Sequence, residues 1–174
     1  MNAIDCLMTR RSIRLFSERP VGSDQIRTLL EVFFRSPSAA DARPWHLVVV
    51  LDRGRLTAFA DAMPKCDMLR TAAAGLVVCA DPSMEKIPGF WVQDCAAATQ
   101  NLLVAAHGLG LGGVWIGLHP VPSREAAVRE ALGIPAARIP FSLVALGWPA
   151  ESPAPDERFD DTRLHRERWG RPYS

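Results

Sequence analysis

The longest apolar stretch of the chain runs from Val92 to Gly117, VQDCAAATQNLLVAAHGLGLGGVWIG. Its first part, Val92 to Ala106, is rich in Ala, Leu and Cys, and this composition predicts a helix. The polar exceptions are spaced seven apart in two series and fall on one narrow stripe: Gln93, Gln100 and His107, and Asp94 and Asn101. A helix that is apolar on nearly every side is buried, so we expect this one to run through the middle of the molecule.

The hydrophobic pattern elsewhere predicts elements that would pack around this helix. Helices are expected at 4–9 after an Asn2 cap, from Ser23 with Ile26, Leu29, Leu30 and Phe33 on one face, at 55–63 and at 123–132. Apolar, β-branched runs predict buried strands at 46–51, 75–80, 114–118 and 141–146, and RSIRLF at 11–16 predicts a short strand. Strands interleaved with helices favour a layered α+β or α/β domain.

The length and charge of the chain narrow the possibilities. The 174 residues are most economically one domain, 1–174, whose proline-rich segment 147–174 is expected to wrap over a surface as a tail. A net charge of +1 gives no general reason to expect nucleic acid or an anionic membrane.

The four cysteines show neither CxxC nor zinc spacing. Free, packed thiols suit a reducing compartment, and we expect a cytoplasmic protein. The N-terminal residues lack the pattern of a signal peptide, and no run approaches the length of a membrane helix.

The glycines at 108–113, GLGLGG, fit G-x-G-x-x-G but lie in the wrong context. A dinucleotide fingerprint needs a strand before the glycines and a helix after them, so that the helix N-terminus meets the pyrophosphate. Here the order is reversed, which favours a helix C-cap and close packing.

Three local patterns are compatible with a ligand site, and each has an ordinary structural alternative. Arg10, Arg11, Ser12 and Arg14 would suit a phosphate, or form a solvated basic turn. The loop 36–45 would supply ligand contacts, or simply connect two elements. The glycines around Trp115 would let the backbone approach a planar ligand, or serve core packing. Because the sequence shows neither a hydrolase triad nor metal-ligand spacing, such a site would need a cofactor to carry the chemistry.

Taken together and in order, these segments resemble the nitroreductase-like FMN-dependent oxidoreductase family, particularly its short members. The resemblance covers essentially the whole chain, through RRSIRLF at 10–16, SPSAADARPW at 36–45, QDCAAATQNLLVAAHGLGLGGVWIG, LGIP at 132–135, VALGWPAE at 144–151 and the LHRERWG ending. It implies an α+β sandwich with a central, mostly antiparallel sheet, helices around it and a long buried central helix. It also implies an intertwined homodimer with FMN at the subunit interface and the tail 147–174 wrapping the partner.

The resemblance also implies roles for individual residues. Arg10, Arg11 and Ser12 would hold the FMN phosphate, with Arg158 as a further candidate, and Arg14 would lie near the N1/C2-carbonyl edge of the isoalloxazine. Ser38, Asp41 and Arg43 would reach the flavin of the other subunit, and Trp115, Ile116 and Gly117 would lie along its ring. The family has Asn and Gln where this chain has Asp41 and Arg43, so these two would either offset one another as an ion pair or alter redox potential and substrate preference.

The expected activity is that of an FMN-dependent NAD(P)H oxidoreductase. NADH or NADPH would reduce the flavin at N5, and a small-molecule acceptor such as a nitroaromatic or a quinone would then take the hydride in a ping-pong cycle. The flavin would carry the chemistry, so no catalytic side chain is assigned. The alternatives are a flavin enzyme of the same fold with other chemistry, such as dehalogenation or an oxidase reaction, and a non-catalytic flavin-binding domain.

Overall fold

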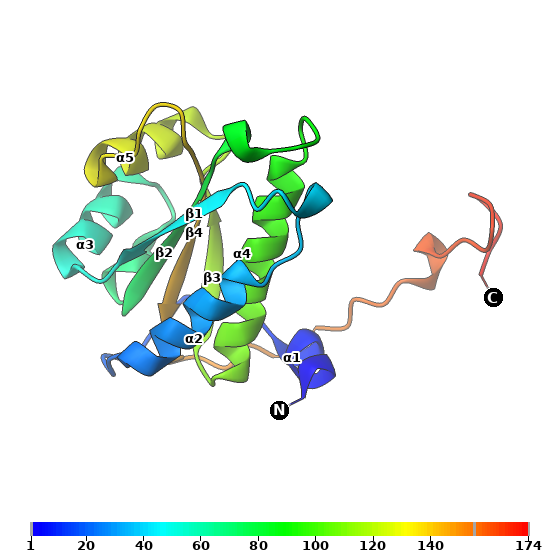
Figure 1. Ribbon diagram of the computed structural model, residues 1–174. Helices are drawn as coiled ribbons and strands as arrows, with labels where there is room; N and C mark the ends of the chain where they lie inside the picture. The colour runs from blue at the N-terminus through cyan, green and yellow to red at the C-terminus, as the bar shows by residue number, and fades with distance from the viewer. Residues whose placement is uncertain (1, 155, 174) are drawn as a thin grey trace.

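The computed structural model describes residues 2–154 and 156–173. Within them the chain forms one antiparallel four-stranded sheet with the strand order β1-β2-β4-β3 and helices on both faces (Figure 1). The predicted α+β class is confirmed, and the mostly antiparallel sheet is antiparallel throughout. The strands are β1 (Trp45–Val50), β2 (Ala74–Ala80), β3 (Gly112–Gly117) and β4 (Ile139–Gly147), and the helices are α1 (Ala3–Thr9), α2 (Ser23–Phe34), α3 (Arg53–Ala62), α4 (Trp91–Gly108) and α5 (Pro122–Leu132).

The sheet is the middle layer of the molecule. Helices α2 and α4 cover one face and α3 and α5 the other (Figure 1). The side chains of β2 point alternately to the two faces. Leu76 and Val78 belong to the hydrophobic cluster under α4, and Val77 and Cys79 belong to the cluster under α3 and α5. Strand β2 is buried along its whole length because it has a neighbour on each side and helices on both faces.

Helix α4 is the central helix that the sequence predicts, but one chain does not enclose it. It packs against the sheet, α2 and α1. Leu102 and Leu103 are buried, whereas Val92 is 37% exposed and Val104 is only half-buried. Within a single chain, α4 therefore does not run through the middle of the molecule as expected. The sheet covers only one side of the helix.

Two further expectations need correction. The segment 11–16 is not a strand, because it makes only isolated bridges, at Ser12 to Gly113 and at Phe16 to Pro149. The predicted buried strand 46–51 is β1, shifted by one residue, and it is only partly buried. Strand β1 lies at the edge of the sheet, which leaves its middle residues partly exposed.

The predicted helix ends are largely confirmed. Asn2 and Asp5 form a reciprocal capping box at the start of α1. Helix α5 ends at Gly133 in the left-handed conformation, with φ 63°. The glycines after α4 lie between a helix and a strand, and Gly110 has φ 78°, as expected for a C-cap rather than a dinucleotide loop.

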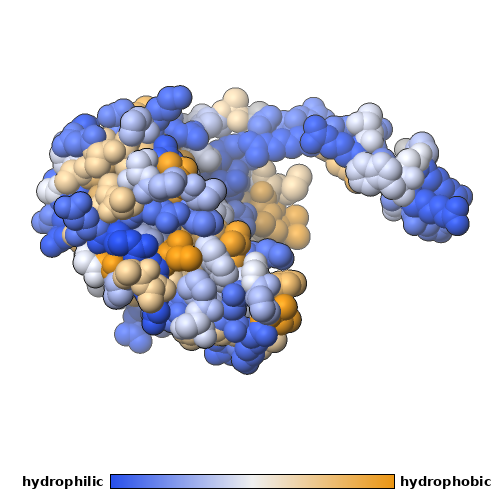
Figure 2. Space-filling model, turned by 90° about the horizontal axis from the view of Figure 1, so that it is seen from above, coloured by the Kyte–Doolittle hydropathy of each residue, from blue (hydrophilic) through white to orange (hydrophobic). Residues whose placement is uncertain are grey.

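The segment after β4 leaves the body as an extended arm (Figure 1). Figure 2 shows this arm as mostly hydrophilic. It nevertheless carries large exposed side chains, with Phe159 79%, Trp169 92% and Tyr173 65% exposed. Across the described ranges, no helix is long and apolar enough to cross a membrane.

Candidate functional site

The basic residues at the end of α1 form a cluster of like charge. Burial and the charges of Arg158 and Arg11 lower the pKa of Arg10, so both of these guanidinium groups lie close enough to act on Arg10. His107, near the C-terminus of α4, lies beside them, and burial together with Arg10 and Arg11 lowers the pKa of its imidazole. Such a cluster favours an anion, because a negative charge would relieve the repulsion.

Arg11 is held by backbone carbonyls. Its Nη1 donates to Met8 O at 3.1 Å and to Arg10 O at 3.0 Å, and its Nη2 lies 3.5 Å from Asp156 O. Its Nε is buried, and no described residue accepts a hydrogen bond from it. Arg11 and His107 line a cavity of about 220 Å³. This cavity therefore borders the basic cluster.

Arg158, the further candidate from the tail, lies near Arg10. Its Nε is 2.7 Å from Asp156 Oδ2 in an exposed ion pair. An incoming anion would therefore compete with the Asp156 carboxylate for Arg158, which makes Arg158 a weaker holder than Arg10.

Ser12 and Arg14 lie in the extended segment that follows the cluster. Ser12 bridges to Gly113, and Ile13 N donates to Gly113 O at 3.1 Å, so the segment runs along the start of β3. A Cβ on Gly112 would lie 2.7 Å from Ile13 Cβ, so this close approach requires the glycine. Arg14 lies further along, where it lines a separate hollow of about 310 Å³ with Lys65 and Asp67.

Trp115, Ile116 and Gly117 form the end of β3, which is an edge strand. Gly113 O faces outward to accept from Ile13, and by the alternation of a strand the backbone groups of Trp115 and Gly117 face outward too. The side chain of Ile116 is buried in the core, and a Cβ on Gly117 would meet no atom within 4 Å. Gly117 O already accepts a hydrogen bond from Arg124 Nη1 at 2.9 Å, so it is the backbone of Trp115 that this edge can present to a flat ligand.

The loop 36–44 brings Ser38, Asp41 and Arg43 together. Ser38 Oγ accepts from Arg43 N at 2.9 Å. Arg43 Nε and Nη2 donate to the two carboxylate oxygens of Asp41 at 2.6 and 2.9 Å. Each partner favours the charged form of the other, since the Arg43 hydrogen bond lowers the pKa of Asp41 and the Asp41 hydrogen bond raises that of Arg43. Of the two alternatives for this pair, the structure contains the ion pair.

Within a single chain, this loop lies far from the arginine cluster. Asp94 contacts the loop near the start of α4, and His107 contacts Thr9 of the cluster region near its end. The two positions are thirteen residues apart on one helix, or about 20 Å at 1.5 Å per residue. Within one chain, the segment with Arg10, Arg11 and Ser12 therefore lies beside β3. Ser38, Asp41 and Arg43 lie near the other end of α4.

Sequence reasoning missed three residues that shape the loop. Lys86 Nζ donates to Ala40 O at 2.9 Å and lies 3.4 Å from Asp41 O. Asp94 Oδ1 accepts from Ala39 N at 2.9 Å, and Asn101 Nδ2 donates to Ser36 Oγ at 2.9 Å. The polar stripe on α4 was a signal for Asp94 and Asn101, whereas nothing in the sequence marked Lys86.

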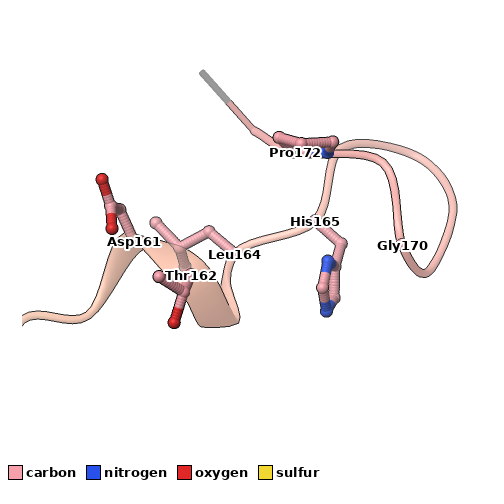
Figure 3. Close-up of a pocket in the computed structure, with 6 residues that line it drawn as sticks. All are labelled: Asp161, Thr162, Leu164, His165, Gly170 and Pro172. Atoms are coloured by element: carbon pink, nitrogen blue, oxygen red, sulfur yellow. The ribbon is translucent and has the colours of Figure 1, made fainter.

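Another hollow belongs to the arm. It measures about 440 Å³ and is lined only by arm residues, among them His165 and Pro172 (Figure 3). None of the predicted site residues lies there, so this hollow carries no part of the candidate site. Within the described residues, no group of three His, Cys, Asp or Glu side chains could hold a metal ion.

Comparison with known proteins identifies the family. The family model described as "Nitroreductase family" matches residues 7–65 and 58–148. The chain is 45% identical over 169 residues to a Methanothermobacter thermautotrophicus protein named "Putative NADH dehydrogenase/NAD(P)H nitroreductase", covering 97% of this chain and 88% of the relative. The chain therefore belongs to the nitroreductase family.

Solved structures agree with this assignment. A protein of the same name from Parabacteroides distasonis has a TM-score of 0.92 at 33% identity, covering 97% of this chain and 100% of the other. A Desulfovibrio desulfuricans nitroreductase structure in complex with FMN has a TM-score of 0.86 at 28% identity, covering 97% and 98%. An NADPH:FMN oxidoreductase from Vibrio harveyi complexed with NAD⁺ has a TM-score of 0.85 at 25% identity, covering 97% and 78%.

Proposed function

We propose that this protein is an FMN-dependent NAD(P)H oxidoreductase that reduces nitroaromatic or quinone-type acceptors by a ping-pong cycle. The main observation behind this proposal is that the arginine cluster lies beside the edge strand β3. The cluster would bind a phosphate, and the strand edge would bind a flat ring. The relatives support it by their names, and the complexes with FMN and NAD⁺ support the choice of cofactor and electron donor.

The residues present fit FMN. Arg10, Arg11 and Ser12 would hold the phosphate, with Arg158 as a further cation. The outward backbone of Trp115 would lie along the ring, and the absence of a side chain at Gly117 leaves space for it.

Bound FMN would supply the redox chemistry, which is hydride transfer through N5 from NADH or NADPH to the acceptor. The chain would hold the rings in place and adjust the local charge. Arg14 and Arg43 are the cations that would stabilise negative charge on the reduced ring, with Asp41 opposing Arg43. No side chain is required as a dedicated acid, because solvent can supply the proton.

The working unit would be a homodimer of a single domain, 1–174. One chain keeps Ser38, Asp41 and Arg43 about 20 Å along α4 from the arginine cluster. A second copy would bring its own loop to the first copy's cluster and complete two equivalent sites. The open side of α4 and the exposed Phe159 and Trp169 of the arm are apolar surfaces that such a partner would cover.

Anaerobic half-reactions test the function directly. NADH or NADPH added to the FMN-loaded protein should bleach the flavin absorbance, and a quinone or nitroaromatic added next should restore it. Steady-state plots at several acceptor concentrations should then be parallel. Failure of both nicotinamides to reduce the bound flavin would contradict the proposal and favour another flavin chemistry.

A further inference from the structure

The loop 36–44 has an unusual backbone. Ala40, Asp41 and Arg43 have φ values of 52°, 53° and 51°, in the left-handed region that non-glycine residues rarely adopt. Each such residue costs free energy and persists only where its surroundings hold it. Three of them within four positions indicate that other parts of the molecule fix this loop.

Asp94 provides one anchor. Its side chain is 4% exposed, and Oδ1 accepts the Ala39 N–H at 2.9 Å, one residue before the first left-handed position. A hydrogen bond at a buried acceptor is costly to leave unmade. The contact therefore fixes the backbone at the point where it enters the left-handed stretch.

Asn101 provides a second anchor, two turns further along the same face of α4. Its Nδ2 donates at 2.9 Å to the hydroxyl of Ser36, which is 7% exposed and begins the loop. Asp94 and Asn101 belong to the polar stripe of an otherwise apolar helix, and both face the loop. A helix packed on the sheet is a rigid support for such anchors.

We propose that Asp94 and Asn101 are positioning residues that hold the loop 36–44 in the conformation in which Ser38, Asp41 and Arg43 meet the flavin of a second copy. The inference rests on the proposed function for its flavin part. The anchoring itself is a property of the chain without FMN, so the two parts can be measured separately.

The first measurement is amide hydrogen exchange of residues 39–43 in the FMN-free protein. Asp94→Ala should speed exchange at Ala39 by about tenfold or more, because it removes the hydrogen bond of the Ala39 N–H to a buried acceptor. Asp94→Asn keeps an oxygen that can accept from Ala39 N and should restore most of the protection. Asp52→Ala is the matched control, since Asp52 also accepts a backbone N–H, from Arg55 at 2.8 Å, but at the start of α3.

The second measurement is FMN affinity and the visible spectrum of the bound flavin in the same variants. Asp94→Ala should weaken FMN binding and shift the flavin bands, Asp94→Asn should do so much less, and Asp52→Ala should do neither. Ser36→Ala and Asn101→Ala should each have a smaller effect, and their double variant should resemble the singles because both remove the same hydrogen bond.

The outcomes separate the two claims. Unchanged exchange at residues 39–43 in Asp94→Ala would overturn the anchoring. Faster exchange with unaltered FMN affinity and spectrum would overturn the positioning role. A wild-type protein that takes up no FMN would overturn the proposed function and the flavin part of this inference together, while the exchange data would still report the anchor.

Discussion

The carboxylate of Asp41 and the guanidinium of Arg43 face each other in a two-point ion pair, with N–O distances of 2.6 and 2.9 Å. Both residues have left-handed backbones, which turn them toward one another across Ala42. The family resemblance implies two neutral amides at these positions. The chain instead carries two charges that neutralise each other.

We predict that single substitutions of this pair shift the flavin reduction potential in opposite directions. Asp41→Asn leaves Arg43 unopposed, which favours the anionic reduced flavin and raises the potential. Arg43→Gln leaves Asp41 unopposed and lowers it. Equilibrium titration against a redox dye measures the shifts. The double variant should lie close to wild type, and two singles that shift in the same direction would contradict the offsetting role.

We predict that Arg10→Glu abolishes FMN retention. The substitution replaces a cation of the phosphate cluster with an anion, next to Arg11 and Arg158. Fluorescence titration with FMN measures the loss. Arg53→Glu makes the same charge change at the start of α3, on the other face of the sheet, and should bind FMN as wild type does. An unchanged affinity in Arg10→Glu would refute the phosphate assignment.

We predict that His107 makes stability depend on pH in the weakly acidic range. Burial and the charges of Arg10 and Arg11 lower its pKa below the ordinary 6.5, so the unfolded chain takes up the proton more readily than the folded one. The free energy of unfolding should therefore fall as the pH drops below about 6.5 toward the lowered pKa. Urea denaturation at several pH values measures this slope.

His107→Gln should flatten that slope, because it removes the titrating group. His165→Gln, in the arm, is the control and should keep the wild-type slope. Equal slopes in wild type and His107→Gln would show that His107 does not contribute.

We predict that Asp81 stabilises the end of β2. Its side chain is 3% exposed, accepts from Ser83 N at 3.1 Å and pairs with Arg138 at 2.9 Å. Burial alone would raise its pKa, but the hydrogen bonds from Ser83 and His46 and the charge of Arg138 outweigh it, and the pKa is lowered. Its stabilisation should hold at neutral pH and disappear as the pH falls through that lowered pKa.

At neutral pH, Asp81→Ala should lower the free energy of unfolding by about 1.5–3 kcal/mol, because it removes the Ser83 hydrogen bond and the Arg138 ion pair of a buried carboxylate. Asp61→Ala removes an exposed pair with Arg70 at 2.6 Å and should cost at most about 1 kcal/mol. Chemical denaturation compares the two variants. A similar loss in both would contradict the buried role of Asp81.

Much of the fold could be predicted from local pattern. The α1 cap and the Gly133 stop are encoded in neighbouring residues, so the sequence displays them. The failed strand at 11–16 has a physical reason. Ile13 and Phe16 are the buried residues, and they are three apart rather than two, so the segment makes one isolated bridge to Gly113 of β3 and another to Pro149 instead of a ladder.

The sequence predicted which motifs make up the candidate site, but not the hydrogen bonds and ion pair that hold the loop 36–44. The arginine cluster and the glycines of β3 are visible as motifs. Asp94 and Lys86 contact backbone atoms of Ala39 and Ala40 in the loop. Every residue has such backbone atoms, so the residue types at these positions could not predict the contacts. The pairing of Asp41 with Arg43 also depends on left-handed backbone at these residues. Neither is a glycine, so the sequence gives no sign of that conformation.

The most direct test of this account is a visible absorption spectrum of the purified protein, recorded before and after addition of excess FMN and removal of the unbound flavin. The flavin released by denaturation should then be identified. We expect flavin bands near stoichiometric with the chain and FMN as the released species. A colourless protein that takes up no FMN would contradict it, and would mean that this chain keeps the fold of its family without the cofactor.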